Sequence, residues 1–223
     1  MIQKENGEQV TTSHAAAREK IVRKVTWVGL WVNLFLIKEK NLPVEFVVQD
    51  PWPEDSPIIE KNPLSKIPVL EVGPDNYLFE SIFIAHYLDN IDGRPLQPKD
   101  AEGYWHCQWW QALGNGIIDA VIARVLETRR PPDKQWPEKM QREELRVQRA
   151  IEVAENAYRG NRFLVGYAFT MADLVMGVAL QYVDFRYPHD WRTTHPKLAR
   201  WHASIITRRS FEETLPPGFV KPA

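Results

Sequence analysis

The sequence predicts two domains, an α/β layer over residues 1–91 and an all-helical domain over residues 99–223. Three observations favour this division. Two short β-rich stretches and a helix follow one another between Asn62 and Asp89. Residues 92–98, DGRPLQP, have the composition of a linker. From Ala101 onward the apolar residues recur at helical spacing.

The best-defined unit of the chain runs from Asn62 to Asp89. Residues 67–72 (IPVLEV) predict a strand, residues 73–76 (GPDN) a turn, and residues 77–79 a return strand. A helix then begins at Glu80 and Ser81. Its N-terminal N–H groups and dipole favour a carboxylate, and Glu80 can pair with an ammonium. A carboxylate and an ammonium together form the end of an α-amino acid, so this helix start suits such a ligand. A plain ββα unit whose Glu-Ser cap is exposed to solvent would show the same sequence pattern.

The segments 62–70 (NPLSKIPVL) and 79–88 (FESIFIAHYL) carry a family resemblance. They resemble the glutathione-binding half of the glutathione transferase family, and the likeness extends over about residues 36–215. In that family, a cis-proline pair presents its backbone to the cysteinyl part of glutathione, and a Glu-Ser pair holds the γ-glutamyl end. The resemblance therefore implies a glutathione site formed by Lys66, Ile67, Pro68, Glu80 and Ser81.

The N-terminal part departs from the family pattern. Residues 15–24 are rich in helix formers and residues 25–37 are mostly apolar, so we expect one helix over about residues 15–40. Together with a predicted strand at residues 44–48, buried in a parallel pair, the order is that of a thioredoxin-like layer whose first strand is missing or altered. Residues 1–35 are thus interpreted as an atypical helical extension. Residues 18–34 also resemble the start of cation diffusion facilitator transporters, but they are too short to span a membrane.

The family's thiol-activating hydroxyl or thiol sits in a loop between its first strand and first helix. Bacterial members often show Ser-Pro-x-x-Arg-Lys-Val there, and only the tail of that pattern, residues 23–25, is present. Alignment on this tail puts Glu19-Lys20 in place of Ser-Pro, and alignment on the helix end puts Trp27-Val28 there. Ser13, in the segment Ser13-His14-Ala15, is the candidate catalytic residue, although no Ser-Pro follows it.

The helical domain contributes a predicted second-substrate pocket and a structural cap. Residues Trp105, Trp109 and Arg124 fall on one face of the first long helix, which borders that pocket in the family. The same tryptophans are equally expected to pack between helices. Thr170 and Asp173 form a capping box, so Asp173 is structural.

Bulk composition sets limits on the partners. A net charge of −1 favours neither nucleic acid nor a membrane surface, and the scattered histidines show no metal signature. One cysteine, Cys107, fits a reducing compartment such as the cytoplasm, and is interpreted as a core residue.

We therefore expect a cytoplasmic, homodimeric glutathione transferase that uses glutathione as co-substrate, without a metal, in detoxification. Its activity is expected to be weak, because the activating loop is altered. The alternatives are a non-catalytic glutathione-binding or scaffold protein of the same fold, and a membrane-attached protein that uses residues 21–37.

Overall fold

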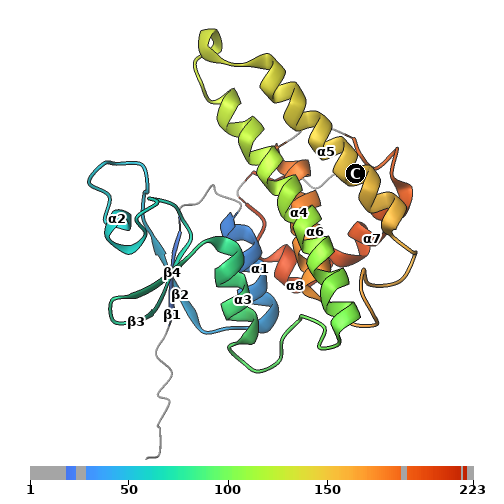
Figure 1. Cartoon of the computed structure of the whole chain (residues 1–223), viewed down its shortest axis with the longest axis horizontal. Helices are drawn as coiled ribbons and strands as arrows, with labels where there is room; N and C mark the ends of the chain where they lie inside the picture. The colour runs from blue at the N-terminus through green and yellow to red at the C-terminus, as the bar shows by residue number, and fades with distance from the viewer. Residues whose placement is uncertain (1–18, 24–28, 187–189, 217, 220–223) are drawn as a thin grey trace, which may run out of the picture.

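A computed structural model of the chain describes residues 19–23, 29–186, 190–216 and 218–219. A small sheet lies at one end and the long helices lie at the other (Figure 1). Helices α1 and α3 stand between these two parts. This arrangement agrees with the predicted α/β layer followed by an all-helical domain.

The sheet has four strands in the order β2-β1-β3-β4. β1 runs parallel to β2 and antiparallel to β3, which pairs antiparallel with β4. Ile21 faces Phe46 of β2 and Leu70 of β3 in the register, so β1 occupies a central position. The strands are β1 (Glu19–Arg23), β2 (Val44–Val48), β3 (Val69–Gly73) and β4 (Asn76–Phe79).

The strand β1 corrects the prediction of one helix over residues 15–40. Helix α1 (Gly29–Lys40) forms only the second part of that range, and the first strand, expected to be missing or altered, is present. Local composition favoured a helix, but pairing with two neighbouring strands overrides such weak propensities. β2 was predicted to be buried, but it is the edge strand of the sheet in the order above. Its Val48 is 60% exposed.

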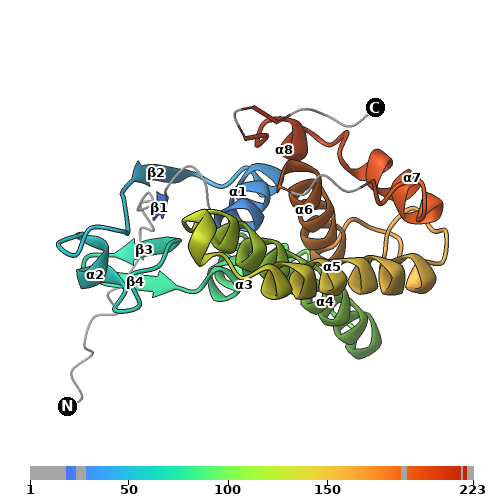
Figure 2. The same ribbon diagram turned by 90° about the horizontal axis from the view of Figure 1, so that it is seen from above.

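Helices cover both faces of the sheet (Figure 2). Successive strand residues point to opposite faces, and Leu70 of β3 joins the main core, which includes residues of α1 and α3 (Ser81–Asn90). Val69 instead packs with Ile58 of the short helix α2 (Ile58–Lys61) in a second cluster. Each face of the sheet is therefore packed against at least one helix, and α3 lies on the face that looks towards the helical domain.

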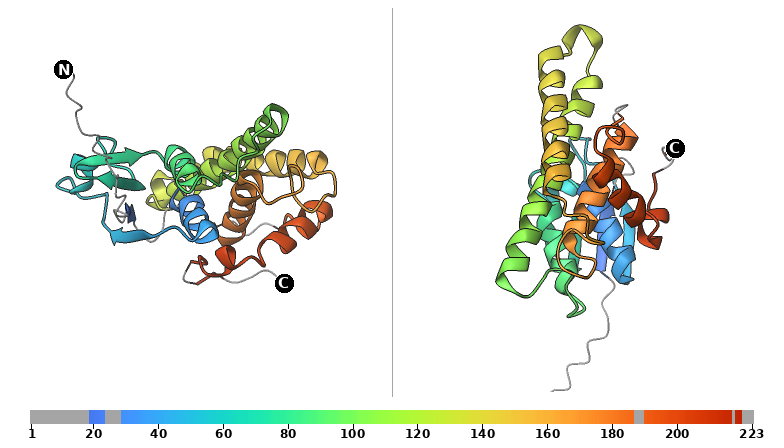
Figure 3. Two further views of the ribbon diagram at one scale, coloured as in Figure 1. Left: turned by 90° about the horizontal axis from the view of Figure 1, so that it is seen from below. Right: turned by 90° about the vertical axis from the view of Figure 1, so that its right-hand side faces the viewer.

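The helical domain is built around a helical hairpin. α4 (Ala101–Thr128) and α5 (Pro137–Ala157) pack side by side, and their tip stands beyond the rest of the molecule (Figures 1 and 3). The remaining elements are η1 (Pro132–Lys134), α6 (Met171–Arg186), α7 (Pro196–Ile205) and α8 (Arg209–Glu212).

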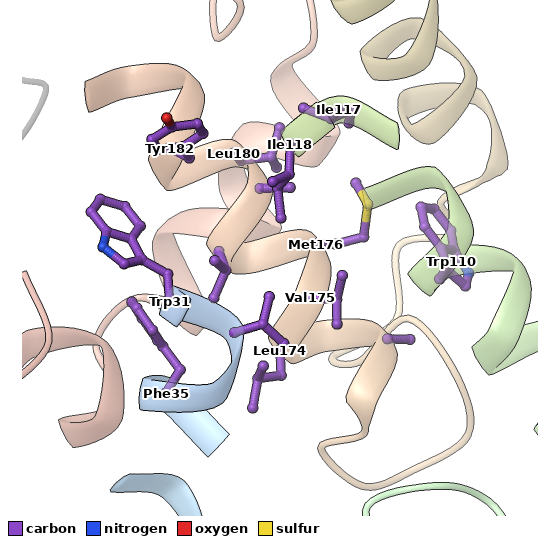
Figure 4. Close-up of a cluster of buried hydrophobic side chains, with 14 of the residues drawn as sticks. Trp31, Phe35, Trp110, Ile117, Ile118, Leu174, Val175, Met176, Leu180 and Tyr182 are labelled. Carbon is purple, nitrogen blue, oxygen red and sulfur yellow. The ribbon is translucent and has the colours of Figure 1, made fainter. Parts of the chain in front are cut away.

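Helix α6 is the centre of the core. Its apolar residues lie all around the helix, as expected for a helix enclosed by others. Trp31 and Phe35 of α1 approach it from one side and residues of α4 from the other (Figure 4). At Gly114 of α4, an added Cβ would come within 2.9 Å of Val175 Cγ1, so the glycine permits the close approach of the two helices.

A buried ion-pair network fixes the junction between the two parts. The Lys40 side chain, 4% exposed, donates to the carbonyl oxygens of Asp89 and Arg94 and pairs with Asp92 at 2.8 Å. Asp89 in turn accepts a hydrogen bond from the backbone N–H of Leu96 at 2.8 Å. The end of α1, the end of α3 and the linker are thereby held together.

Two findings concern the membrane-attached alternative. Among the described residues, no helix is long and apolar enough to cross a membrane. Part of the stretch 18–34 lies outside the described residues, so its resemblance to the start of a transporter stays a prediction.

Candidate glutathione site

The first part of the site is the loop that leads into β3. The peptide bond between Ile67 and Pro68 is cis, as the family resemblance implies. Asn62, 1% exposed, holds the loop: its Nδ2 donates to the Lys66 carbonyl at 2.8 Å, and its Oδ1 accepts from the Leu64 N–H at 3.0 Å. The loop is therefore braced from inside while Lys66 remains exposed beside the cis bond.

The second part is the N-terminus of α3. Glu80 precedes the helix with φ at 74°, in the left-handed region that a non-glycine residue rarely adopts. Such backbone strain often accompanies a functional site. Ser81 Oγ donates to Glu80 Oε1 at 3.2 Å, and the carboxylate makes no cap hydrogen bond to the helix. The helix start thus presents the Glu80 carboxylate and the Ser81 hydroxyl next to free backbone N–H groups. These N–H groups attract an anion.

A cavity of about 140 Å³ connects this helix start to α4. Asn115 and Asp119 of α4 line it opposite Glu80 and Ser81, while apolar side chains of α1 and α4 form the remaining wall. A second, smaller space beside it also includes Ser81 and Asn115. The α3–α4 groove therefore offers polar groups on two walls and apolar surface on a third.

Three charges converge at this groove. Burial raises the pKa of the Asp119 carboxyl, and the negative charge of Glu80 raises it further, whereas Lys66 acts in the opposite direction. This pattern requires Lys66, Glu80 and Asp119 to lie within electrostatic reach of one another. Glu80 can therefore pair with an ammonium of a ligand, and Lys66 can pair with a carboxylate.

The comparisons with known proteins agree with this geometry. The model of the glutathione S-transferase N-terminal domain matches residues 22–90, and the model of its C-terminal domain matches residues 137–204. A solved glutathione S-transferase from Methylobacillus flagellatus, with glutathione bound, is 30% identical, with a TM-score of 0.83 over 89% of this chain and 99% of that one.

The chain belongs to the glutathione S-transferase family.

Two curated relatives show how the family varies. The uncharacterized GST-like protein YibF of Escherichia coli is 29% identical over 184 residues, 82% of this chain and 91% of that protein. Elongation factor 1-gamma 3 of rice (Oryza sativa) is 28% identical over 77% of this chain, which spans 41% of that protein. The family match begins at residue 22, earlier than residue 36, where the sequence resemblance was expected to begin.

The glutathione S-transferase fold brings together the five residues predicted to bind glutathione. Three of them lie on the loop before β3, and the other two, Glu80 and Ser81, lie at the start of α3 and line the cavity. The predicted residues are Lys66, Ile67, Pro68, Glu80 and Ser81.

The three residues predicted for the second-substrate pocket do not line this cavity. Trp105 and Trp109 are 68% and 44% exposed on the outer surface of α4. Arg124 Nε donates to Glu144 Oε1 of α5 at 2.8 Å. Arg124 follows Asn115 by nine residues, which is about half a turn around the helix, and so it faces the hairpin partner instead.

Asn115 and Asp119 were missed by the sequence analysis. Their signal is a pair of polar residues four apart, which share one face of a helix whose other faces are apolar. The tryptophans were predicted instead, because large aromatic side chains commonly line apolar pockets.

Ser13, the predicted catalytic residue, lies outside the described residues. In chain order it precedes β1, whereas the family's activating residue follows the first strand. The corresponding connection here, residues 24–28 (KVTWV), also lies outside the described residues. Its sequence contains one hydroxyl residue, Thr26.

Cys107 is a core residue, as the sequence analysis interpreted it. Its side chain is fully buried on α4, and burial raises the pKa of the thiol to about 11. At neutral pH the thiol is protonated and is a poor nucleophile. Among the residues that the structure describes, no group of three or more His, Cys, Asp and Glu side chains is placed to hold a metal ion.

Proposed function

We propose that this protein binds glutathione at the α3–α4 groove and conjugates its thiolate to a small electrophile. The observation that carries the proposal is the juxtaposition of the cis Ile67–Pro68 loop with the Glu80-Ser81 helix start beside a partly apolar cavity. A solved relative with glutathione bound shares this fold at 30% identity.

Each part of glutathione has a matching group in the groove. The γ-glutamyl carboxylate accepts hydrogen bonds from the α3 N-terminus and the Ser81 hydroxyl, and the α-ammonium pairs with Glu80. The backbone of Ile67 pairs with the cysteinyl part, and Lys66 attracts a carboxylate. The electrophile then occupies the part of the cavity beside Asn115 and Asp119.

The reaction requires the bound thiol to lose its proton before the sulfur attacks. Each unit by which the thiol pKa is lowered corresponds to about 1.4 kcal/mol of thiolate stabilisation. In the family, a residue of the loop after the first strand supplies this stabilisation. Here the loop sequence KVTWV contains no Ser-Pro or Cys-Pro, and Ser13 is the hydroxyl that we propose for the role.

A non-catalytic glutathione-binding or scaffold protein is the second candidate. It is favoured by the altered activating loop and by relatives that are named elongation factor 1-gamma rather than transferase. Both candidates bind glutathione, so only turnover separates them.

Conjugation of glutathione to a chloro-nitrobenzene is the experiment that tests the proposal. We expect a rate roughly 10²–10³-fold below that of a family member with an intact Ser-Pro loop, by analogy with the loss of one oxyanion donor. A normal rate that is lost in Ser13→Ala would contradict this expectation and would show that Ser13 activates the thiol, and Thr26→Ala is the matched comparison within the loop after β1. No turnover above the uncatalysed rate, with glutathione still bound, would favour the scaffold protein.

We also propose that the protein is a homodimer. Several large apolar side chains of α3 and α4 are exposed, among them Phe83 at 54%, Ile82 at 46% and Trp105 at 68%. Contiguous exposed apolar surface commonly marks an interaction site. A second copy of the chain would cover it, in agreement with the assembly expected from the family.

We further propose a detoxifying role in the cytoplasm, because the proposed chemistry removes electrophiles and a single cysteine, Cys107, is compatible with a reducing compartment.

A further inference from the structure

Helices α4 and α6 both lead from the glutathione cavity to a group of arginine and aromatic side chains. Asn115 of α4 and Val175 of α6 line the small space beside that cavity. Farther along, the charge of Arg129, which caps the end of α4, acts on the hydroxyl of Tyr182 in α6. The two helices therefore run in the same direction, and their C-terminal ends, with Arg129 and Arg186, lie on the same side of the cavity.

Arg129 continues the face of α4 that lines the cavity. Ile122, which lines the cavity, precedes Arg129 by seven residues, so the two share one face of the helix about 10 Å apart along its axis. Arg129 keeps helical backbone angles, φ −85° and ψ −11°, and it is exposed. A molecule that extends along α4 from the cavity therefore reaches this arginine.

Arg186 lies on an aromatic cluster at the same end of the two helices. Its Cζ is 4.1 Å from the ring centroid of Phe185 and 6.0 Å from that of Tyr182. The ring centroid of Trp31 in α1 lies 5.4 Å from that of Tyr182 (Figure 4) and 5.6 Å from that of Phe185. The residue after Trp31, Val32, lines the glutathione cavity. Phe185 and Arg186 are partly exposed, so this cluster presents both a ring and a guanidinium group at the surface beside the cavity.

The charge at this end of the helices is positive. Burial raises the pKa of the Tyr182 hydroxyl, whereas the charges of Arg186 and Arg129 act in the opposite direction. Such opposition requires both guanidinium groups to lie within electrostatic reach of that hydroxyl. Among the described residues, neither arginine pairs with a carboxylate. The two cations therefore lie near one another without a counter-ion from that part of the chain.

The carboxylates that come nearest to these two arginines in the chain are engaged by other groups. Glu127, 2% exposed, pairs with Lys139 at 3.1 Å and accepts from a backbone N–H at 2.9 Å. Asp184 accepts hydrogen bonds on both oxygens from Arg192, at 2.7 and 2.6 Å. Neither carboxylate is available to neutralise the arginines.

The opposite end of the cavity is negative. Asp119 and Glu80 line it there, and Asp119 precedes Arg129 by ten residues, about 15 Å along α4. The two carboxylates repel an anion, so an anionic group on a bound molecule is directed away from them and towards the arginines.

Arginine stays charged at any physiological pH and binds carboxylate, sulfonate and phosphate oxygens with its fork of N–H groups. We propose that the electrophile is an aromatic or other apolar molecule that carries an anionic group, such as a carboxylate, which pairs with Arg129 and Arg186 while the apolar body lies along Ile122. This inference rests on the proposed function, because it specifies the second substrate of that reaction. The thiol proton of glutathione passes to solvent, the sulfur bonds to the reactive carbon, and the leaving group departs with its electron pair. The anionic group takes no part in the bond changes.

Two glutathione derivatives that differ in one carboxylate test the inference without turnover. S-benzylglutathione, S-(4-carboxybenzyl)glutathione and glutathione itself are titrated calorimetrically into the full chain. We expect the added carboxylate to strengthen binding about tenfold, the value of one charged hydrogen bond. Equal or weaker binding of the carboxylated derivative, with glutathione still bound, would overturn the inference and leave the proposed function standing. A chain that binds none of the three ligands would refute the proposed function, and this inference with it.

Two variants assign the contact. In Arg129→Gln or in Arg186→Gln the tenfold advantage should fall at least about threefold, and in the double variant it should disappear. Binding of S-benzylglutathione should be unchanged in all of them, which separates loss of the anion contact from loss of folding. Arg149→Gln, which alters an exposed arginine of α5 outside the cavity lining, is the matched control and should keep the advantage. An advantage that persisted in the double variant would show that these arginines do not bind the anion, and would refute the proposal.

Discussion

At the cap of α6, the contribution of a buried carboxylate to the free energy of unfolding can be predicted from its hydrogen bonds. Asp173, fully buried, accepts hydrogen bonds from the Leu164 N–H at 2.8 Å and from the Thr170 N–H and hydroxyl at 2.9 Å each. Asp173→Ala leaves two backbone donors without a partner, and each such loss costs about 1–3 kcal/mol. Burial also raises the pKa of Asp173, so removal of its charge offsets part of this cost. We therefore expect a loss of about 2–4 kcal/mol in the free energy of unfolding.

Asp190→Ala is the matched control for this prediction. Asp190 also accepts from two backbone N–H groups, those of Arg192 and Thr193, and from the Thr193 hydroxyl, but it is exposed. Water can replace these bonds, so we expect a loss of less than about 1 kcal/mol. Urea denaturation followed by far-UV circular dichroism, at one protein concentration, measures both variants. Equal losses in the two variants would refute the argument that burial sets the cost.

Two further predictions concern acid stability and assembly. Because burial lowers the pKa of His202 to about 4, from about 6.5 in the unfolded chain, its neutral form stabilises the fold fully above pH 6.5, and this contribution is lost as the pH falls towards 4. Between pH 7 and pH 5 the free energy of unfolding should fall about 2 kcal/mol less in His202→Phe than in the unaltered protein, and an equal fall would contradict the assignment. Light scattering at micromolar concentration should give twice the 26.0 kDa chain mass, and Phe83→Glu should give the single-chain mass; a single-chain mass for the unaltered protein would exclude the dimer.

The sequence predicted the loop before β3, with its cis-proline bond, and the start of α3 well as structural features, because their signals are local. These signals depend only on residues close together in the sequence: a proline after an apolar residue, a turn of Gly, Pro and Asn, and a Glu-Ser pair at a helix start. The same holds for the cap of α6, where Asp173 accepts from the Thr170 N–H as predicted.

The sequence predicted poorly those features that depend on distant partners. β1 contains Glu, Lys and Arg, which favour a helix locally, and only its pairing with β2 and β3 makes it a strand. The position of α3 decides which face of α4 lines the cavity, and so the sequence did not single out Asn115 and Asp119. The spacing of residues within β1 or α4 does not reveal the neighbouring strands or the position of α3.

Calorimetric titration of glutathione tests the central claim most directly. Glu80→Gln removes the charge that pairs with the α-ammonium and should weaken binding about 10- to 100-fold, the value of a charged hydrogen bond. Ser81→Ala should weaken it about three- to tenfold, whereas Glu54→Gln, an exposed carboxylate away from the groove, should leave it unchanged. Affinity that is unchanged in both Glu80→Gln and Ser81→Ala would show that glutathione does not bind at the start of α3.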